Sequence, residues 1–114
     1  MIFYYLLSYF RWYFGPISRR TAEEYLSVHT NARGTFLVRE SEQNPGGFAL
    51  SIKDWDNERA YHVKHYKIKP LDNNRGFYIT TRQTFASLQE LVKGYQSTLC
   101  KGRFLEYIFI YILS

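Results

Sequence analysis

The middle of this chain alternates apolar and polar residues as globular domains do, whereas both ends are almost entirely apolar and aromatic. Period-two alternation in the middle predicts strands over residues 35–41, 48–53, 60–69 and 77–81. The sequence NPGG at 44–47 predicts a tight turn between the first two of these strands. We therefore expect neighbouring strands that return antiparallel to one another.

Helical spacing predicts one helix before the strands and one after them. Ser18 caps the first helix, and Ser87 to Glu90 form a capping box at the start of the second. A meander of strands between two helices predicts an α+β fold, in which a central antiparallel sheet is flanked by two helices. The apolar positions with helical spacing are Ala22, Tyr25 and Leu26 in the first helix and Leu88, Leu91, Val92 and Tyr95 in the second.

The length of 114 residues suits one domain with one core. We assign this domain to residues 12–102, between an apolar tail over 1–11 and another over 103–114. Neither tail reaches the roughly 20 residues that span a bilayer. Their origin stays open: they are either extra strand or helix packed on the core, or sequence foreign to the domain.

The net charge of +5 favours an anionic partner, without distinguishing nucleic acid, lipid headgroups and phosphoprotein. Cys100 is the single cysteine, which excludes an internal disulfide. No basic segment with a small-residue cleavage site marks a secretory signal. These features together favour a cytoplasmic location.

Arg39 lies inside an apolar strand, in the run Phe36 to Ser41. A buried guanidinium costs several kcal/mol unless it is paired and hydrogen-bonded, and it cannot lose its proton to escape that cost. We therefore expect an anion beside Arg39. The run alone does not distinguish a bound anionic ligand from an internal carboxylate. It also leaves open an edge strand on which Arg39 lies on a solvated face and needs no anion.

Strand periodicity brings further polar side chains toward Arg39. Ser41 shares its face of the first strand, and His65 and Lys67 share one face of the third. If the first helix covers this face, Arg19 joins them. Together they offer two guanidinium groups, a hydroxyl and an ammonium, a set that matches a dianionic phosphate.

Five sequence segments, in this order, carry a family resemblance. They are WYFG with ISRR at 12–20, GTFLVRESE at 34–42, VKHYKI at 63–68, GFYIT at 76–80 and FASLQELV at 85–92. This pattern resembles the Src homology 2 (SH2) domain, and among these domains most of all those of the Src-family cytoplasmic tyrosine kinases. The resemblance implies a non-catalytic module that binds phosphotyrosine peptides without a cofactor. The module would be a fragment of a Src-like kinase or an adaptor.

The resemblance also implies a role for each residue of a phosphotyrosine pocket. Arg39 corresponds to the arginine at the base of the pocket, which pairs bidentately with phosphate. Arg19 and Lys67 correspond to residues on the two sides of the tyrosine ring. Ala49 stands where Src-type domains often have cysteine. The full set implied for phosphotyrosine binding is Arg19, Arg39, Ser41, Glu42, Gln43, His65 and Lys67.

A second set of residues is implied for the peptide beyond the phosphotyrosine. Tyr66, Ile79 and Thr80 resemble the wall of a hydrophobic hole for the third residue after it, and Lys64 favours acidic residues in between. Residues 96–102, which include Leu99, depart from the loop that usually completes this hole. This departure concerns the peptide preference beyond the phosphotyrosine and not phosphotyrosine binding itself.

Other classes of function fit the sequence less well. His62 and His65 lack the further ligands of a metal site, so we expect no metal. Ser41 with His65 lacks an orienting carboxylate and the glycines of a nucleophile elbow, and the chain has no kinase glycine-rich or catalytic loop, so we expect no enzyme activity. Nucleic-acid binding is disfavoured because most aromatic residues follow core periodicity. We expect tyrosine-phosphorylated proteins as partners, and an intramolecular phosphotyrosine tail stays open as a ligand.

Overall fold

The computed structural model describes residues 12–99. Both apolar tails, over 1–11 and 103–114, and residues 100–102 lie outside the described residues. The chain divides into two compact units, the first ending at Lys67 and the second beginning at Ile68. Each unit is described by itself below.

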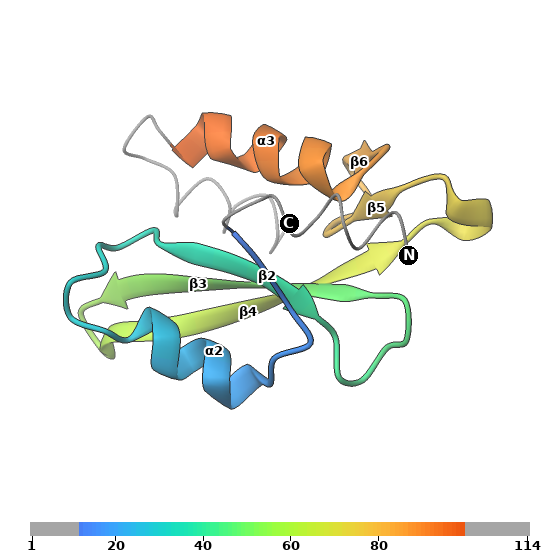
Figure 1. Cartoon of the computed structure of the whole chain (residues 1–114). Helices are drawn as coiled ribbons and strands as arrows, with labels where there is room; N and C mark the ends of the chain where they lie inside the picture. The colour runs from blue at the N-terminus through green and yellow to red at the C-terminus, as the bar shows by residue number, and fades with distance from the viewer. Residues whose placement is uncertain (1–11, 100–114) are drawn as a thin grey trace. The chain divides into compact units, whose positions relative to one another are not determined.

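The first unit is a sheet with one helix (Figure 1). Its strands follow one another in the order β1-β2-β3-β4. β2 and β3 are antiparallel, as expected, but β1 runs parallel to β2, with Tyr13 opposite Val38. The pattern did not predict β1, because three residues are too few to show alternation. The elements are β1 Tyr13–Gly15, α2 Arg19–Leu26, β2 Phe36–Glu40, β3 Phe48–Asp56 and β4 Ala60–Pro70, whose end belongs to the second unit.

β3 is longer than the sequence pattern predicts. The alternation predicts a strand that ends at residue 53, but β3 continues to Asp56. Lys53 and Asp54 are both buried there. Asp54 accepts hydrogen bonds from Arg33 and from the backbone N–H of Trp55, at 3.0 and 2.7 Å. Because these partners satisfy the carboxylate, polar residues can stay inside a strand that their composition would have ended.

α2 begins as predicted. The side chain of Ser18 accepts a hydrogen bond from the backbone N–H of Thr21 at 3.0 Å and so caps the helix. Ala22 and Leu26 are buried in one cluster with Leu37 of β2, so α2 covers the sheet face that carries Leu37. Tyr25, which follows the same spacing, is instead 47% exposed.

The second unit contains the end of β4, two short strands and a helix (Figure 1). β5 pairs antiparallel with both β4 and β6. The predicted strand over 77–81 is shorter than expected, and β6 was not predicted. Ser87 caps the helix as predicted, since its hydroxyl accepts from the N–H of Glu90 at 3.1 Å. The elements are the 3-10 turn η1 Asp72–Asn74, β5 Phe77–Tyr78, β6 Thr84–Phe85 and α3 Leu88–Leu99.

Within residues 12–99, no helix is long and apolar enough to cross a membrane.

Candidate functional site

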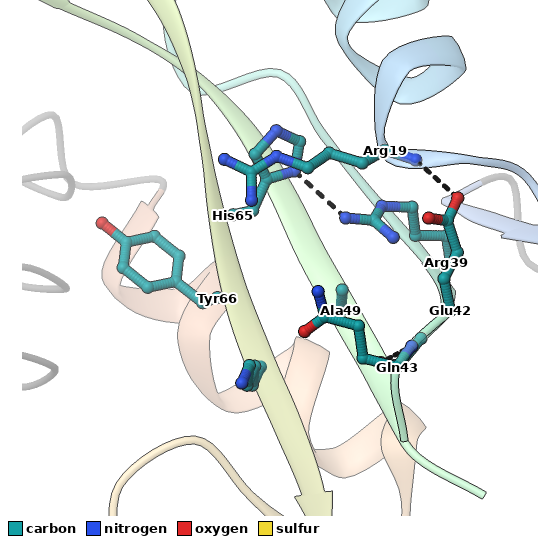
Figure 2. A pocket seen from close by; sticks show the side chains of 9 residues that line it. Arg19, Arg39, Glu42, Gln43, Ala49, His65 and Tyr66 are labelled. Carbon is teal, nitrogen blue, oxygen red and sulfur yellow. Dashed lines mark hydrogen bonds between the residues drawn. The ribbon is translucent and has the colours of Figure 1, made fainter. Parts of the chain in front are cut away.

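One pocket in the first unit gathers side chains from four segments of the chain (Figure 2). They come from α2, from β2 with the loop after it, from β3 and from β4. All seven residues implied for phosphotyrosine binding line it, so the structure brings that whole set together. The lining consists of Arg19, Arg39, Ser41, Glu42, Gln43, Ala49, His65, Tyr66 and Lys67.

Arg39 lies at the buried base of this pocket with 5% of its surface exposed. Its Nε donates to Ser51 Oγ at 3.2 Å, and its Nη2 donates to His65 Nδ1 at 3.3 Å. Burial lowers the pKa of Arg39, with nearby Glu42 acting in the opposite direction. Within residues 12–95, the guanidinium thus donates its hydrogen bonds to neutral acceptors. The charge of Arg39 has no bonded carboxylate among them to neutralise it.

The ring of His65 is held in one tautomer. A guanidinium can only donate, so Nδ1 of His65 accepts from Arg39 and also from the hydroxyl of Ser51 at 2.8 Å. The proton of the neutral ring is therefore on Nε2, which donates to Glu23 Oε1 at 2.8 Å. Burial lowers the pKa of His65, although the hydrogen bond to Glu23 opposes this shift. A lowered pKa favours the neutral ring, in agreement with the donor and acceptor roles of its two nitrogens.

Sequence reasoning missed Ser51 and Glu23. The strand register puts Ala49 opposite Arg39 and Ser51 opposite Leu37, so period-two alternation along β3 could have placed Ser51 on the same face as Arg39. Glu23 lies four residues after Arg19, which puts both side chains on one face of α2. Its Oε1 lies 3.4 Å from Arg19 Nε. The hydrogen bond from His65 and the nearby arginine lower the pKa of Glu23.

The loop after β2 closes one side of the pocket. Ser41 Oγ accepts from the backbone N–H groups of Gln43 and Asn44 at 3.3 and 3.2 Å. Ser41 N–H in turn donates to Gly47 O at 3.0 Å, which ties the two ends of the loop together. Glu42 Oε1 accepts from the backbone N–H of Arg19 at 3.1 Å, so a loop side chain reaches the first turn of α2 (Figure 2).

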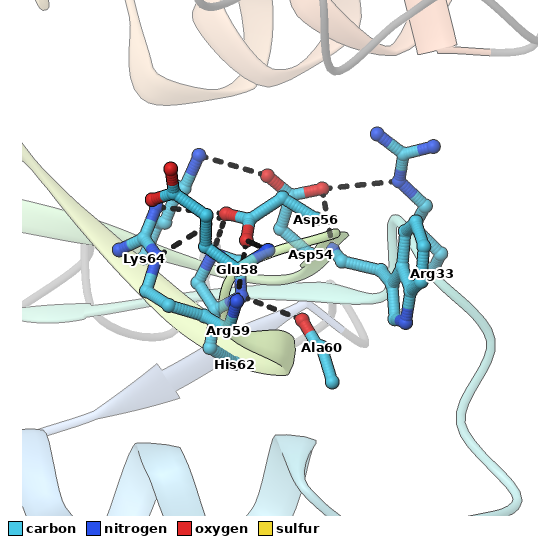
Figure 3. A network of polar contacts seen from close by, with 9 residues as sticks. Arg33, Asp54, Asp56, Glu58, Arg59, Ala60, His62 and Lys64 are labelled. Atoms are coloured by element: carbon cyan, nitrogen blue, oxygen red, sulfur yellow. Dashed lines mark hydrogen bonds and ion pairs between the residues drawn. The ribbon is translucent and has the colours of Figure 1, made fainter.

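The residues implied for peptide specificity are placed differently. The Tyr66 ring projects from the opposite side of β4 to Arg39 (Figure 2), and burial raises the pKa of its hydroxyl. Lys64 Nζ lies 2.9 Å from Asp54 Oδ2, within a network of charged side chains at one end of β3 and β4 (Figure 3). Ile79, Thr80 and Leu99 belong to the second unit.

The geometry bears on two alternative kinds of site, a metal site and a catalytic serine–histidine pair. Among the residues that the structure describes, no cluster of three His, Cys, Asp or Glu side chains is placed to hold a metal ion. The expectation that no carboxylate orients His65 is wrong, because Glu23 does so. The serine beside His65 is Ser51, which is 0% exposed and accepts from Arg39. A serine in that position cannot reach a substrate, so the arrangement orients Arg39.

Comparison with known proteins identifies the family. A model of the SH2 domain matches residues 12–95 of this chain. The chain belongs to the SH2 domain family. This SH2 domain is a non-catalytic binding module of the kind that binds phosphotyrosine. It is similar to the tyrosine-protein kinase Src64B of Drosophila melanogaster, with 58% identity over 84 residues. The aligned region covers 74% of this chain and 15% of that relative, so the chain matches only a small part of the kinase.

Proposed function

We propose that the pocket around Arg39 binds the phosphotyrosine side chain of a tyrosine-phosphorylated protein. One observation supports this above all others: a buried guanidinium at the base of the pocket is held by Ser51 and His65, both neutral. A buried cation without a bonded counter-ion is costly, and a phosphate that pairs with it in a bidentate fashion removes that cost.

The other side chains of the pocket suit the rest of this ligand. Arg19 and Lys67 supply two further positive charges, which a phosphate of charge about −2 can use. Their stems and charges can also lie against the faces of the tyrosine ring. Ser41, in the loop after β2, lines the pocket, and its hydroxyl can donate to a phosphate oxygen. We assign the phosphate to Arg39, Arg19 and this loop, and the ring to Arg19 and Lys67.

We also propose a preference in the peptide after the phosphotyrosine, which rests on the SH2 resemblance. The third residue is aliphatic, and acidic residues precede it. The ion pair of Lys64 with Asp54 limits the second part of this preference, because the lysine charge is already partly neutralised. We expect the acidic preference to be weaker than the aliphatic one.

Isothermal titration calorimetry on the chain tests the proposed function. The ligand is a peptide with phosphotyrosine followed by two glutamates and an isoleucine, and the control is the same peptide without phosphate. We expect saturable binding of the first and no measurable binding of the second. Equal heats for the two peptides would exclude phosphotyrosine recognition.

The kind of parent protein is a separate proposal. We infer that the parent protein is a cytoplasmic Src-like non-receptor tyrosine kinase, with an adaptor as the second candidate. The similarity to the tyrosine-protein kinase Src64B supports the kinase. Nucleic-acid binding is tested by titrating an oligonucleotide at rising salt. An affinity for the oligonucleotide that falls about a thousandfold between 50 mM and 200 mM salt would indicate contacts with its phosphate backbone instead of binding in the pocket.

A further inference from the structure

A chain of hydrogen bonds joins the half-exposed Glu23 of α2 to the buried base of the pocket. It runs from Glu23 Oε1 to His65 Nε2 over 2.8 Å, and from His65 Nδ1 to Arg39 Nη2 over 3.3 Å. Ser51 closes a triangle with the last two residues, through contacts of 2.8 Å to His65 and 3.2 Å to Arg39. Each of these atoms has a defined role as donor or acceptor.

We propose that Glu23 is a positioning residue for phosphate binding, which acts through His65 to hold the guanidinium of Arg39. This inference rests on the proposed function of the pocket. By accepting from Nε2, Glu23 keeps the lone pair of Nδ1 free for Arg39. With that tautomer lost, Nδ1–H would point at a donor of Arg39, and the guanidinium would lose one of its two anchors.

The direction in which the affinity changes when Glu23 is removed distinguishes positioning of Arg39 from the electrostatic effect of the Glu23 charge. Glu23 brings a negative charge near Arg39, at the base of a pocket that is proposed to bind an anion. If only this charge mattered, removing it would tighten the binding of phosphate. If Glu23 positions Arg39, removing its acceptor oxygen weakens binding instead. A variant that loses the charge but keeps the acceptor divides the two effects.

The variants are Glu23→Ala, which removes both charge and acceptor, and Glu23→Gln, which keeps an acceptor oxygen for Nε2–H. Glu24→Gln is the matched control, since Glu24 is exposed on the same helix, pairs with Arg20 and is absent from the pocket. With the phosphotyrosine peptide we expect Glu23→Ala to weaken binding about three- to tenfold, the range for one lost hydrogen bond. Glu23→Gln binds as tightly as the unchanged chain or more tightly, and Glu24→Gln is unchanged.

A double-mutant cycle with His65→Ala shows whether Glu23 acts through His65. If Glu23 acts through His65, Glu23→Ala has no further effect on binding in the His65→Ala chain. If it acts through Arg19, whose Nε it also contacts, the penalty persists and the proposal is overturned. Nitrogen NMR of the His65 ring needs no ligand. We expect the Nε2–H tautomer in the unchanged chain and in Glu23→Gln, and a tautomer mixture in Glu23→Ala.

The outcomes distinguish this inference from the proposed function. No binding of the phosphotyrosine peptide by the unchanged chain would overturn both. Normal binding together with a Glu23→Ala chain that binds equally well or more tightly would overturn the positioning role alone. An unaltered His65 tautomer in Glu23→Ala would overturn it as well.

Discussion

Arg39 Nε donates to the hydroxyl of Ser51 across 3.2 Å, and this contact fixes the edge of the guanidinium that faces the core. Arg39 also lines the pocket, where the rest of its guanidinium can donate to a ligand. Arg39→Lys should weaken phosphotyrosine-peptide binding by more than about a hundredfold, because an ammonium cannot form the bidentate pair. Calorimetry measures this, and near-normal affinity would remove the central role of Arg39.

The same burial predicts an effect on stability. Arg39→Leu should leave the free energy of unfolding unchanged or higher, because an apolar side chain replaces a buried charge without a bonded counter-ion. Urea unfolding of the ligand-free chain measures this. A large loss of stability would mean that the guanidinium supports the fold more than it serves a ligand.

Phosphoserine peptides should bind at least about tenfold more weakly than matched phosphotyrosine peptides, a gap that corresponds to the contact of the aryl ring with cations. Arg39 is buried at the base of the pocket, so the phosphate needs a long, rigid arm to reach it. The measurement is calorimetry with two peptides that differ at this residue alone. Equal affinities would contradict a deep pocket.

The third residue after the phosphotyrosine is the next test. A change from isoleucine to alanine in the peptide should weaken binding about three- to tenfold. This is less than full burial of an aliphatic side chain would give, because residues 96–102 depart from the loop that usually completes the hole. A peptide series at this position measures the preference. A flat response would withdraw the Src-like specificity and leave phosphotyrosine recognition in place.

We predict from the contacts of Asp54 that the fold loses stability in acid. Burial works to raise the pKa of Asp54, but hydrogen bonds from Lys64, the Trp55 N–H and Arg33 outweigh it, so the pKa is lower than usual. A lowered folded-state pKa adds stability above the unfolded value of about 4, and that stability is lost as the pH falls below it. Asp54→Asn should lower the free energy of unfolding at pH 7 by about 2 kcal/mol, since Lys64 loses its carboxylate partner.

Urea unfolding from pH 7 to pH 2 checks this, with the exposed Asp72→Asn as control. The stability difference between the unchanged chain and Asp54→Asn should shrink as the pH falls below about 4. A difference that stays constant with pH would show that the carboxylate charge does not contribute.

We predict that the position of Gly76, in the second unit, tolerates no side chain. Its φ is +137°, and an added Cβ would lie 1.9 Å from the carbonyl oxygen of Phe85. Gly76→Ala should lower the free energy of unfolding by about 3 kcal/mol or more, because both the backbone and the neighbouring strand must shift. Gly46 has a φ of +80° with open space around it, so Gly46→Ala should cost only about 1 kcal/mol. Thermal unfolding that ranks the two variants equally would contradict this contrast.

The local parts of this protein were determined by the sequence. The caps at Ser18 and Ser87 were predictable because a capping hydroxyl bonds to backbone two or three residues ahead. Arg39 was conspicuous because a cation inside an apolar strand violates the strand's own pattern. Strand alternation then placed Ser41, His65 and Lys67 on the side of Arg39, whereas Glu42 and Gln43 followed from the SH2 resemblance alone.

Only the tertiary structure decided what lies around Arg39. Glu23 and His65 are 42 residues apart and Ser51 and His65 are 14 apart, so no local pattern links them. The extension of β3 through Asp54 has the same origin, because a buried carboxylate is tolerated only once Lys64 and Arg33 have reached it. Sequence periodicity reports which side chains are buried, whereas the satisfaction of a buried polar group depends on partners that folding brings together.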